Sequence, residues 1–383
     1  MIYLDNAATS FPKPAAVIEE TVRCMRQYCG NPGRGSHRLA MEAAEKIFEC
    51  RMEIADLFGV PNPESVIFTM NTTMALNIAI KGLLRRGDHV LISDLEHNAV
   101  LRPIHKLAEE GLITYDLFSS RAKDPHANAG AICAGIARLI KPNTRMLICS
   151  HASNICSYRF PLKEIGALCR RMGILLVVDA AQSVGHLPIN VEEMQIDALC
   201  APGHKGLLGP QGSGFLILRE GLEADTLLEG GSGYHSLDRS MPADAPERYE
   251  AGTLATPAIA GLLAGIREVK RIGTEAVSRH VTELNLRLQN RLQTMEAVTV
   301  YLPHCVGSVL LFNIEGISAD RVGNALDRMG FCVRAGFHCA ALGHTTLATP
   351  PSGAVRVSPG IFNTKAQIDS FAEAVEEIAR KDR

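Results

Sequence analysis

The chain has 383 residues, of which 46% are hydrophobic and 21% charged, and its formal net charge at pH 7 is −2. This length allows a large core and two domains, and the near-neutral charge gives no electrostatic reason to expect nucleic acid or a membrane surface as a partner. No apolar run approaches a membrane span, and residues 1–5 lack the features of a signal peptide. The eleven cysteines include no CxxC pair, which favours a cytoplasmic protein with reduced thiols.

The pattern of apolar residues predicts an alternation of strands and helices. Strands are predicted at 66–69, 89–93, 113–118, 146–150, 174–178, 198–201 and 215–218, and helices at 15–28, 40–57, 130–140 and 163–172. The alternation between residues 66 and 205 predicts an α/β fold with a mostly parallel, doubly wound sheet.

A second, smaller α+β domain is predicted after this region. One or two long helices are expected at 257–295, strands near 306–314, 331–334 and 354–358, and helices near 319–329 and 365–380. We therefore expect a large domain over 13–255 and a small domain over 256–383 that also includes residues 1–12.

The stretch from 174 to 205 carries an acid and a lysine at two successive strand ends. The apolar run 174–178 stops at Asp179, and Lys205 follows the next short strand with a glycine on each side. Ligands bind at the carboxyl ends of strands in open α/β sheets, and pyridoxal phosphate (PLP) needs a lysine for its Schiff base and an acid for its pyridinium. Alone, Asp179 could cap a helix and Lys205 could be a solvated loop lysine. Together with the phosphate and ring candidates below, they favour a PLP site.

Polar residues follow three other predicted strands. Thr72 and Thr73 stand between the strand 66–69 and an apolar helix that runs to residue 84, an arrangement that suits a phosphate but also suits a plain helix cap. His97 follows the strand 89–93 and could lie against a cofactor ring, act as an acid–base group or be structural. Asn154 belongs to a polar cluster after the strand 146–150.

Two glycine-rich stretches have different interpretations. Residues 209–214 match neither GxGxxG nor the P-loop and precede a strand, so we expect no dinucleotide site there. Residues 229–256 form a long irregular segment with several glycines and prolines, which predicts a functional or interfacial role.

Cys339 is the candidate nucleophile. It follows His338 and stands five residues after Arg334, and nearby cations favour the reactive thiolate, although an inert cysteine is the alternative. A zinc site at His338, Cys339 and His344 fits no standard spacing, so no metal is predicted. Residues 340–353 are expected to be a flexible stretch.

Arg356 interrupts the apolar strand 354–358. An arginine in such a position usually binds a carboxylate in bidentate fashion, and the alternative is a solvent-facing residue of an alternating strand.

At this point the chain resembles the cysteine desulfurase and selenocysteine lyase family of class V aminotransferase-like, fold type I PLP enzymes. The resemblance covers essentially the whole chain, and its order and spacing are specific. The matching segments are 3–9, 34–37, 72–73, 96–98, 153–154, 179–182, 203–205, 250–253, 333–336, 338–339 and Arg356.

The resemblance implies a role for each matching residue. Lys205 would carry PLP, Asp179 would pair with the pyridine nitrogen, and His97 would stack on the ring. The other implied contacts are Gln182 at the ring hydroxyl; Thr73, His204 and the partner subunit's Thr253 at the phosphate, with Thr72 beside them; Asn154 near the ring and substrate; Arg356 at the substrate carboxylate; and Cys339 as sulfur acceptor.

The resemblance therefore implies a homodimeric PLP-dependent cysteine desulfurase, which converts L-cysteine to L-alanine with a persulfide on Cys339 and then passes sulfur to an acceptor protein. The alternatives are a selenocysteine lyase or another class V aminotransferase or epimerase, and a non-catalytic sulfur carrier is disfavoured by the lysine and aspartate. Three features depart from the family pattern: Pro202 replaces a common serine, Phe337 replaces a common histidine, and the short cysteine loop carries His344.

Overall fold

The computed structural model describes residues 1–33 and 35–381. Arg34, part of the matching segment 34–37, lies outside the described residues. In chain order the elements are β1 (Ile2–Tyr3), α1 (Ala15–Gln27), α2 (Arg38–Phe58), the 3₁₀ turn η1 (Pro63–Ser65), β2 (Val66–Thr69), α3 (Thr72–Leu83), β3 (His89–Ser93), α4 (Asn98–Glu109), β4 (Thr114–Phe118), α5 (Ala129–Leu139), β5 (Thr144–Ser150), α6 (Leu162–Met172), β6 (Leu175–Asp179), β7 (Ala198–Pro202), β8 (Gly214–Leu218), α7 (Thr256–Ile272), α8 (Thr274–Leu292), β9 (Val298–Val300), β10 (Leu310–Ile314), α9 (Ala319–Arg328), β11 (Phe331–Cys332), β12 (Arg334–Gly336), α10 (Ala341–Leu347), β13 (Ala354–Val357) and α11 (Lys365–Lys381).

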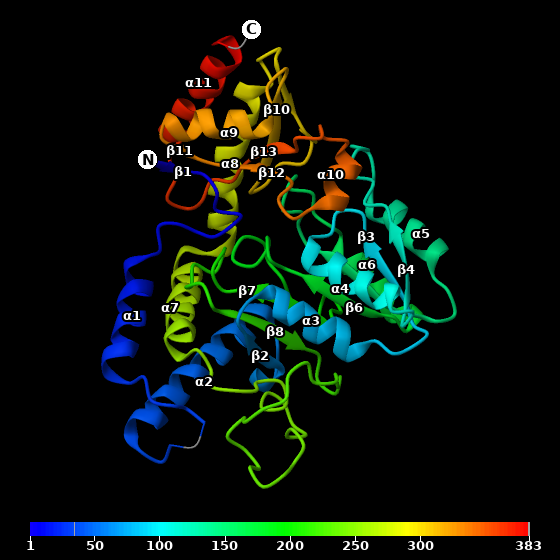
Figure 1. Cartoon of the computed structure of the whole chain (residues 1–383), viewed down its shortest axis with the longest axis vertical. Helices are drawn as coiled ribbons and strands as arrows, with labels where there is room; N and C mark the ends of the chain where they lie inside the picture. The colour runs from blue at the N-terminus through cyan, green and yellow to red at the C-terminus, as the bar shows by residue number, and fades with distance from the viewer. Residues whose placement is uncertain (34, 382–383) are drawn as a thin grey trace.

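A seven-stranded sheet forms the lower part of the molecule in Figure 1, in the order β2-β8-β7-β6-β5-β3-β4. The five strands from β7 to β4 pair in parallel, whereas β8 is antiparallel to both β7 and β2. The predicted α/β fold with a mostly parallel sheet is therefore confirmed.

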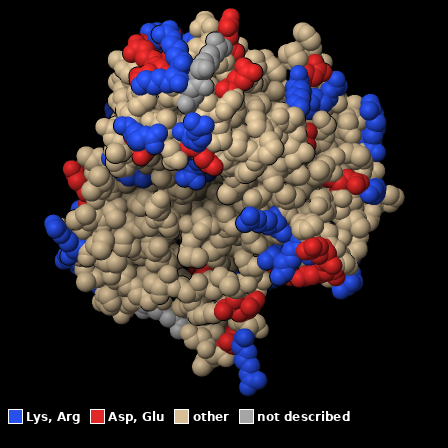
Figure 2. All heavy atoms as spheres, turned by 45° about the horizontal axis from the view of Figure 1, so that its top comes forward, with Lys and Arg blue, Asp and Glu red and all other residues tan. Residues whose placement is uncertain are grey.

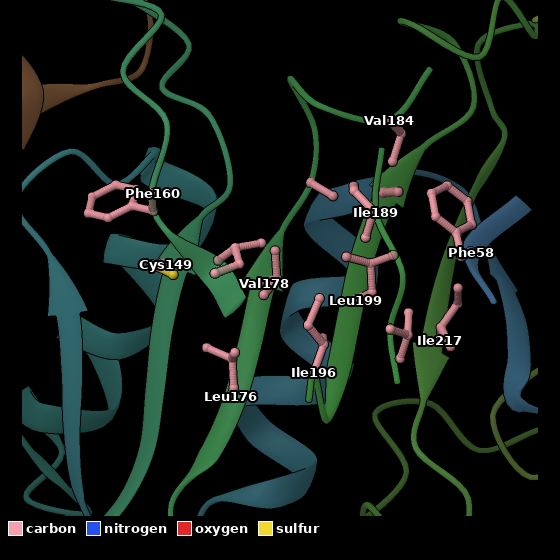
Figure 3. Close-up of a cluster of buried hydrophobic side chains, with 14 of the residues drawn as sticks. Phe58, Cys149, Phe160, Leu176, Val178, Val184, Ile189, Ile196, Leu199 and Ile217 are labelled. Atoms are coloured by element: carbon pink, nitrogen blue, oxygen red, sulfur yellow. The ribbon is translucent and has the colours of Figure 1, made fainter. Parts of the chain in front are cut away.

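Helices cover both faces of this sheet, and strands β2, β3, β6, β7 and β8 are buried at every position. On β6, Leu176 and Val178 pack with one hydrophobic cluster, while Leu175 and Val177 pack with the other. The first cluster includes side chains of α2, α5, α6 and α7, and Figure 3 shows part of it, with side chains from β5, β6, β7 and β8. The second cluster includes side chains of α3 and α4. Successive residues of a strand point to opposite faces, so the continuous apolar runs serve both layers.

A four-stranded sheet, β12-β13-β10-β9, lies in the upper part of the molecule with α8, α9 and α11 around its core. The N-terminal β1 pairs in parallel with β11, which places the first residues of the chain beside this sheet. From there the chain descends to α1, which packs beside α7. The division into domains at residue 256 stays a prediction.

Three local predictions need correction. The stretch 340–353, expected to be flexible, contains helix α10. Strand β9 lies at 298–300, in the interval between residues 295 and 306 for which no element was predicted. Helix α4, which contains Pro103, was not predicted. Proline is unfavourable inside a helix and weakens the sequence signal there.

Figure 2 shows basic and acidic side chains side by side on the face it presents, in keeping with the net charge of −2. None of the helices in the described ranges is both long and apolar enough to cross a bilayer.

Candidate active site

A cavity of about 110 Å³ opens at the carboxyl ends of β5 and β6 and at the start of α3 and α4. Eight of the predicted cofactor residues line it: Thr72, Thr73, His97, Asn154, Asp179, Gln182, His204 and Lys205. They come from five separate segments of the chain, which the parallel strands bring to one edge of the sheet, where such folds bind ligands.

Asp179 is the last residue of β6 and is 4% exposed. Its Oδ1 accepts a hydrogen bond of 2.9 Å from the backbone N–H of Ala181. Burial raises the pKa of the carboxyl, while that hydrogen bond and the charge of Lys205 act in the opposite direction. A buried carboxylate of this kind gains most from a cationic partner, which a protonated pyridine nitrogen would provide.

Lys205 lies three residues beyond β7 and faces the same cavity. Burial lowers the pKa of its ammonium group to about 8, against the opposing charge of Asp179, and Arg356 adds to the lowering. An amine with such a pKa is available in its neutral form near pH 8, as a Schiff-base lysine requires.

The N-terminus of α3 also lines the cavity, through Asn71, Thr72 and Thr73. Asn71 caps the helix by accepting from the backbone N–H of Met74 at 2.9 Å, and Thr72 and Thr73 are the first helical residues. A Cβ added to Gly214 on β8 would stand 2.8 Å from the Asn71 Cα, so only glycine lets the cap approach the strand so closely. Free N–H groups, two hydroxyls and the helix dipole suit a phosphate. Together with Lys205 and Asp179, this donor set fits PLP.

His97 caps α4, with Nδ1 accepting a hydrogen bond of 3.0 Å from the N–H of Ala99. Burial lowers the pKa of its imidazole to about 4, and the charges of Lys205 and Arg356 add to this. The ring is therefore neutral at physiological pH, which suits stacking on an aromatic cofactor better than a role as a cation.

Glu96, which sequence reasoning did not assign to the site, precedes His97 in the chain and is fully buried. Its carboxyl accepts from Ser93 Oγ and from the backbone N–H of Ser150 at 2.8 Å, and contacts Ser150 Oγ at 3.0 Å. Burial raises the pKa of Glu96 to about 8, and the nearby charge of Asp179 contributes. The neutral acid therefore ties the end of β3 to the end of β5.

The N-terminal segment holds the backbone beside Lys205, which sequence reasoning also missed. Four donors converge on the carbonyl oxygen of His204: Lys13 Nζ at 2.8 Å, the Ser10 N–H at 3.1 Å, Thr9 Oγ1 at 3.1 Å and Ser10 Oγ at 3.2 Å. Thr9 Oγ1 also lies 3.1 Å from Nδ1 of His204. These contacts fix the peptide that carries the lysine.

Gln182 and Asn154 connect the cavity to other parts of the chain. Gln182 Nε2 donates to the carbonyl of Ala7 at 3.0 Å, and Asn154 Nδ2 donates to the carbonyl of His338 at 2.8 Å. The second contact fixes the cysteine loop to the edge of the cavity.

Arg356 is 3% exposed, so the alternative of a solvent-facing arginine is wrong. Its guanidinium donates to Asp5 Oδ1 at 2.7 Å and to the Asn154 carbonyl at 3.2 Å, while Nε is buried and has no hydrogen-bond partner among the described residues. Arg334 binds the other oxygen of Asp5 at 3.0 Å. Arg356 does not itself line the cofactor cavity, and its Nε is the one guanidinium nitrogen that the described part of the chain leaves available to a substrate carboxylate.

Cys339 is exposed, and it does not line the cofactor cavity. Its carbonyl accepts from the backbone N–H of Asn98, the first residue of α4, at 2.8 Å. The preceding His338 is 9% exposed, and burial together with the charge of Arg356 lowers the pKa of its imidazole to about 3. His338 is therefore neutral, and a positive charge on it does not activate the thiol as the sequence suggested.

Thr253, the remaining predicted phosphate contact, is exposed and lies outside the cofactor cavity. It lines a separate cavity of about 420 Å³ together with the glycines at 231 and 233, Arg51 and Glu250. Glu250 is buried in an ion pair with Arg51 at 2.5 Å and accepts from the N–H of Phe68 at 2.6 Å, so it anchors the irregular segment 229–256 to the sheet. No cluster with three metal-binding side chains occurs among the described residues.

Comparison with known proteins agrees with this geometry. The family model of aminotransferase class V matches residues 2–371. A probable cysteine desulfurase of Methanothermobacter thermautotrophicus is 34% identical, with 99% of this chain and 94% of that protein covered. A cysteine desulfurase of Yersinia pestis is 30% identical over 99% of this chain and 94% of its own length.

Solved structures give the same result. The apo cysteine desulfurase of Thermococcus onnurineus superposes with a TM-score of 0.89 at 31% identity, covering 99% of this chain and 94% of that one. A cysteine desulfurase of Escherichia coli superposes with a TM-score of 0.87 at 25% identity, again with 99% and 94% coverage. The chain therefore belongs to the aminotransferase class V family, in the group of the cysteine desulfurases.

Proposed function

We propose that the protein is a PLP-dependent cysteine desulfurase that takes sulfur from L-cysteine onto Cys339 and releases L-alanine. The observation that carries this proposal is one cavity with a lysine, a buried carboxylate and a helix N-terminus, whose rim is tied to the cysteine loop through Asn154. When bound there, PLP would supply the electron sink for the pair released when the substrate Cα–H bond breaks.

The residues of the chain would divide the remaining work. Asp179 would keep the pyridine nitrogen protonated, His97 would hold the ring from one side, and the first turn of α3 would hold the phosphate with Thr72 and Thr73. Gln182 would contact the ring hydroxyl and His204 the phosphate. Lys205, with its lowered pKa, would move the Cα proton as base and then as acid.

Cys339 would act as the nucleophile that accepts the sulfur. Its thiolate would attack the sulfur of L-cysteine, so that an S–S bond forms as the Cβ–S bond breaks. The enzyme is left as a persulfide, and the carbon skeleton gains a proton and leaves as alanine. Arg356 and Asn154 would hold the substrate carboxylate during this step. An acceptor protein or a thiol reductant then removes the sulfur.

We also propose a homodimer in the cytoplasm. Thr253 lies outside the cavity of its own chain on an anchored, exposed segment, so a phosphate contact from it requires a second subunit. The eleven cysteines are all free in this chain, which suits a reducing compartment.

The alternatives make different predictions. A selenocysteine lyase would release alanine from selenocysteine and leave cysteine largely unused, and an aminotransferase or epimerase would produce no sulfide. A sulfur carrier without catalysis would bind no PLP.

The test is sulfide and alanine release from L-cysteine with a thiol reductant present. Cys339→Ser should retain the bound cofactor and lose sulfide release, because a hydroxyl cannot accept the sulfur. Cys29→Ser, which changes the other exposed cysteine, should release sulfide at the parent rate. If Cys339→Ser also releases sulfide at the parent rate, Cys339 is not the acceptor.

A further inference from the structure

The backbone at the sulfur-accepting cysteine has an unusual conformation. His338 and Cys339 both adopt left-handed backbone angles, with φ of 53° and 54°. Residues with a side chain rarely adopt this conformation, and two in succession persist only when surrounding contacts hold them.

Backbone contacts supply part of this support. The His338 carbonyl accepts from Asn154 and the Cys339 carbonyl accepts from the N–H of Asn98, each at 2.8 Å. The N–H of Ala340 donates to the carbonyl of Phe337 at 2.9 Å, which closes the turn.

The side chain of His338 supplies the rest through a chain of hydrogen bonds that has one consistent direction. Its Nε2 lies 3.1 Å from the carbonyl oxygen of Arg334, which can only accept, so Nε2 carries the proton. Its Nδ1 must then accept, and the donor 3.1 Å away is Nε2 of His344. With Nε2 of His344 protonated, its Nδ1 accepts from Thr349 Oγ1 at 2.8 Å.

Both rings are buried, with His338 9% and His344 4% exposed, and they lie edge to edge and nearly coplanar, with an interplanar angle of 13° and 5.3 Å between the ring centroids, as the hydrogen bond between them requires. The ring of Phe337 covers His344 edge-on, with 5.3 Å between the ring centroids. A buried imidazole nitrogen without a donor is costly, so the pair holds together only as long as His344 points its N–H at His338.

His344 is in turn fixed to the large sheet through α10. Thr346 Oγ1 of this helix donates to the carbonyl of Asp94 at 3.1 Å, at the end of β3, and Leu347 packs in the core beneath the sheet. The same strand end leads through Glu96 to His97. Helix α10 therefore connects the turn at residues 338–339 to the end of β3, which leads to His97.

We propose that His344 is a positioning residue, which holds the 338–339 turn and thereby presents the Cys339 thiol to the substrate sulfur. The reaction part of this inference depends on the proposed desulfurase function, whereas the part about the turn does not. His344 touches neither cofactor nor substrate in this assignment, and it acts only through His338.

The test compares three variants of the full-length, PLP-loaded protein. His344→Leu removes the donor and fills its place with an apolar side chain, and His344→Gln keeps an N–H where Nε2 stood. Thr345→Val changes the next residue of α10, whose hydroxyl donates to the carbonyl of Ala341. The measurements are amide hydrogen exchange over residues 334–349, visible absorption of the bound cofactor, and sulfide release from L-cysteine.

His344→Leu should speed exchange in the 334–349 segment by about tenfold or more, since one buried acceptor loses its donor. Sulfide release should fall by a similar factor while cofactor absorption stays unchanged. His344→Gln should restore both exchange and activity in large part, and Thr345→Val should match the parent.

Parental exchange in the folded His344→Leu protein would overturn the proposal, as would exchange in His344→Gln as fast as in His344→Leu. Should His344→Leu fail to fold, Thr349→Val replaces it. This change removes the donor to Nδ1 of His344, so that the proton on Nε2 is no longer fixed and exchange in the same segment should be faster. Parental exchange in Thr349→Val would overturn the proposal equally. Cys339→Ser tests the reaction separately: sulfide release by that variant would refute the proposed function and leave the exchange result to decide the role of His344.

Discussion

Glu96 offers a direct test of the electrostatics behind the site. The carboxyl is buried between the ends of β3 and β5, and its pKa is raised from 4.5 to about 8. The folded state therefore binds a proton that the unfolded state releases near pH 4.5. This proton stabilises the fold fully below pH 4.5, and the contribution is lost as pH rises through about 8.

The magnitude follows from the two pKa values. Each pH unit between them changes the free energy of unfolding by about 1.4 kcal/mol, so the parent protein should lose roughly 2 kcal/mol through Glu96 between pH 6 and pH 8. Glu96→Gln keeps a neutral side chain with an acceptor for the Ser150 N–H and a donor for the Ser150 hydroxyl. The stability of the variant relative to the parent should therefore increase by roughly 2 kcal/mol between pH 6 and pH 8.

Urea unfolding at pH 6, 7 and 8 with the same saturating PLP concentration measures this difference, because other titrating groups act equally on both proteins. Glu19→Gln, a change on the exposed face of α1, should leave the pH dependence as it is in the parent. If the free energy of unfolding changes with pH equally in Glu96→Gln and in the parent, the reasoning is refuted, because the pKa of Glu96 is then not raised in the folded state.

Three further substitutions test other parts of the structure. Asp179→Asn should keep bound PLP but lower alanine formation by about 100-fold, because the pyridine nitrogen loses its charged partner; a loss below threefold would contradict the assignment. Glu250→Ala should lower the free energy of unfolding by about 3–5 kcal/mol because Arg51 is left buried and unpaired, whereas Glu247→Ala should cost less than about 0.5 kcal/mol in the same urea assay. Arg356→Gln should raise KM for L-cysteine by about tenfold or more, and Arg334→Gln, which removes the more exposed partner of Asp5, should raise it less; equal effects would argue against a substrate contact.

The sheet was predictable because its strands are short apolar runs. The strands at 66–69 and 89–93 begin and end where the sequence predicts, since β-branched and aliphatic residues buried on both faces leave little ambiguity. The direction of β8 was not predicted. The connection from residue 202 to 214 contains no helix, and parallel neighbours need a crossover, so this was a usable signal.

Helix α10 illustrates what local sequence does not contain. Residues 341–347 include a glycine and two threonines, which are weak helix formers, and the helix is stabilised by packing of Leu347 and the hydrogen bond of Thr346. The pairing of Arg356 with Asp5 joins opposite ends of the chain, and the four donors on the His204 carbonyl come from residues 9–13. Contacts over such separations follow from the assembled fold, and single-sequence patterns carry no trace of them.

The central claim is that Lys205 and Asp179 hold one PLP between them in the cavity at the strand ends. The visible absorption spectrum of the purified protein, recorded with PLP before and after addition of L-cysteine, tests it most directly. We expect an absorption band of bound PLP that changes when L-cysteine is added and that is absent from Lys205→Ala. A protein that stays colourless with PLP, or a Lys205→Ala variant with the parental spectrum and the parental response to L-cysteine, would contradict it.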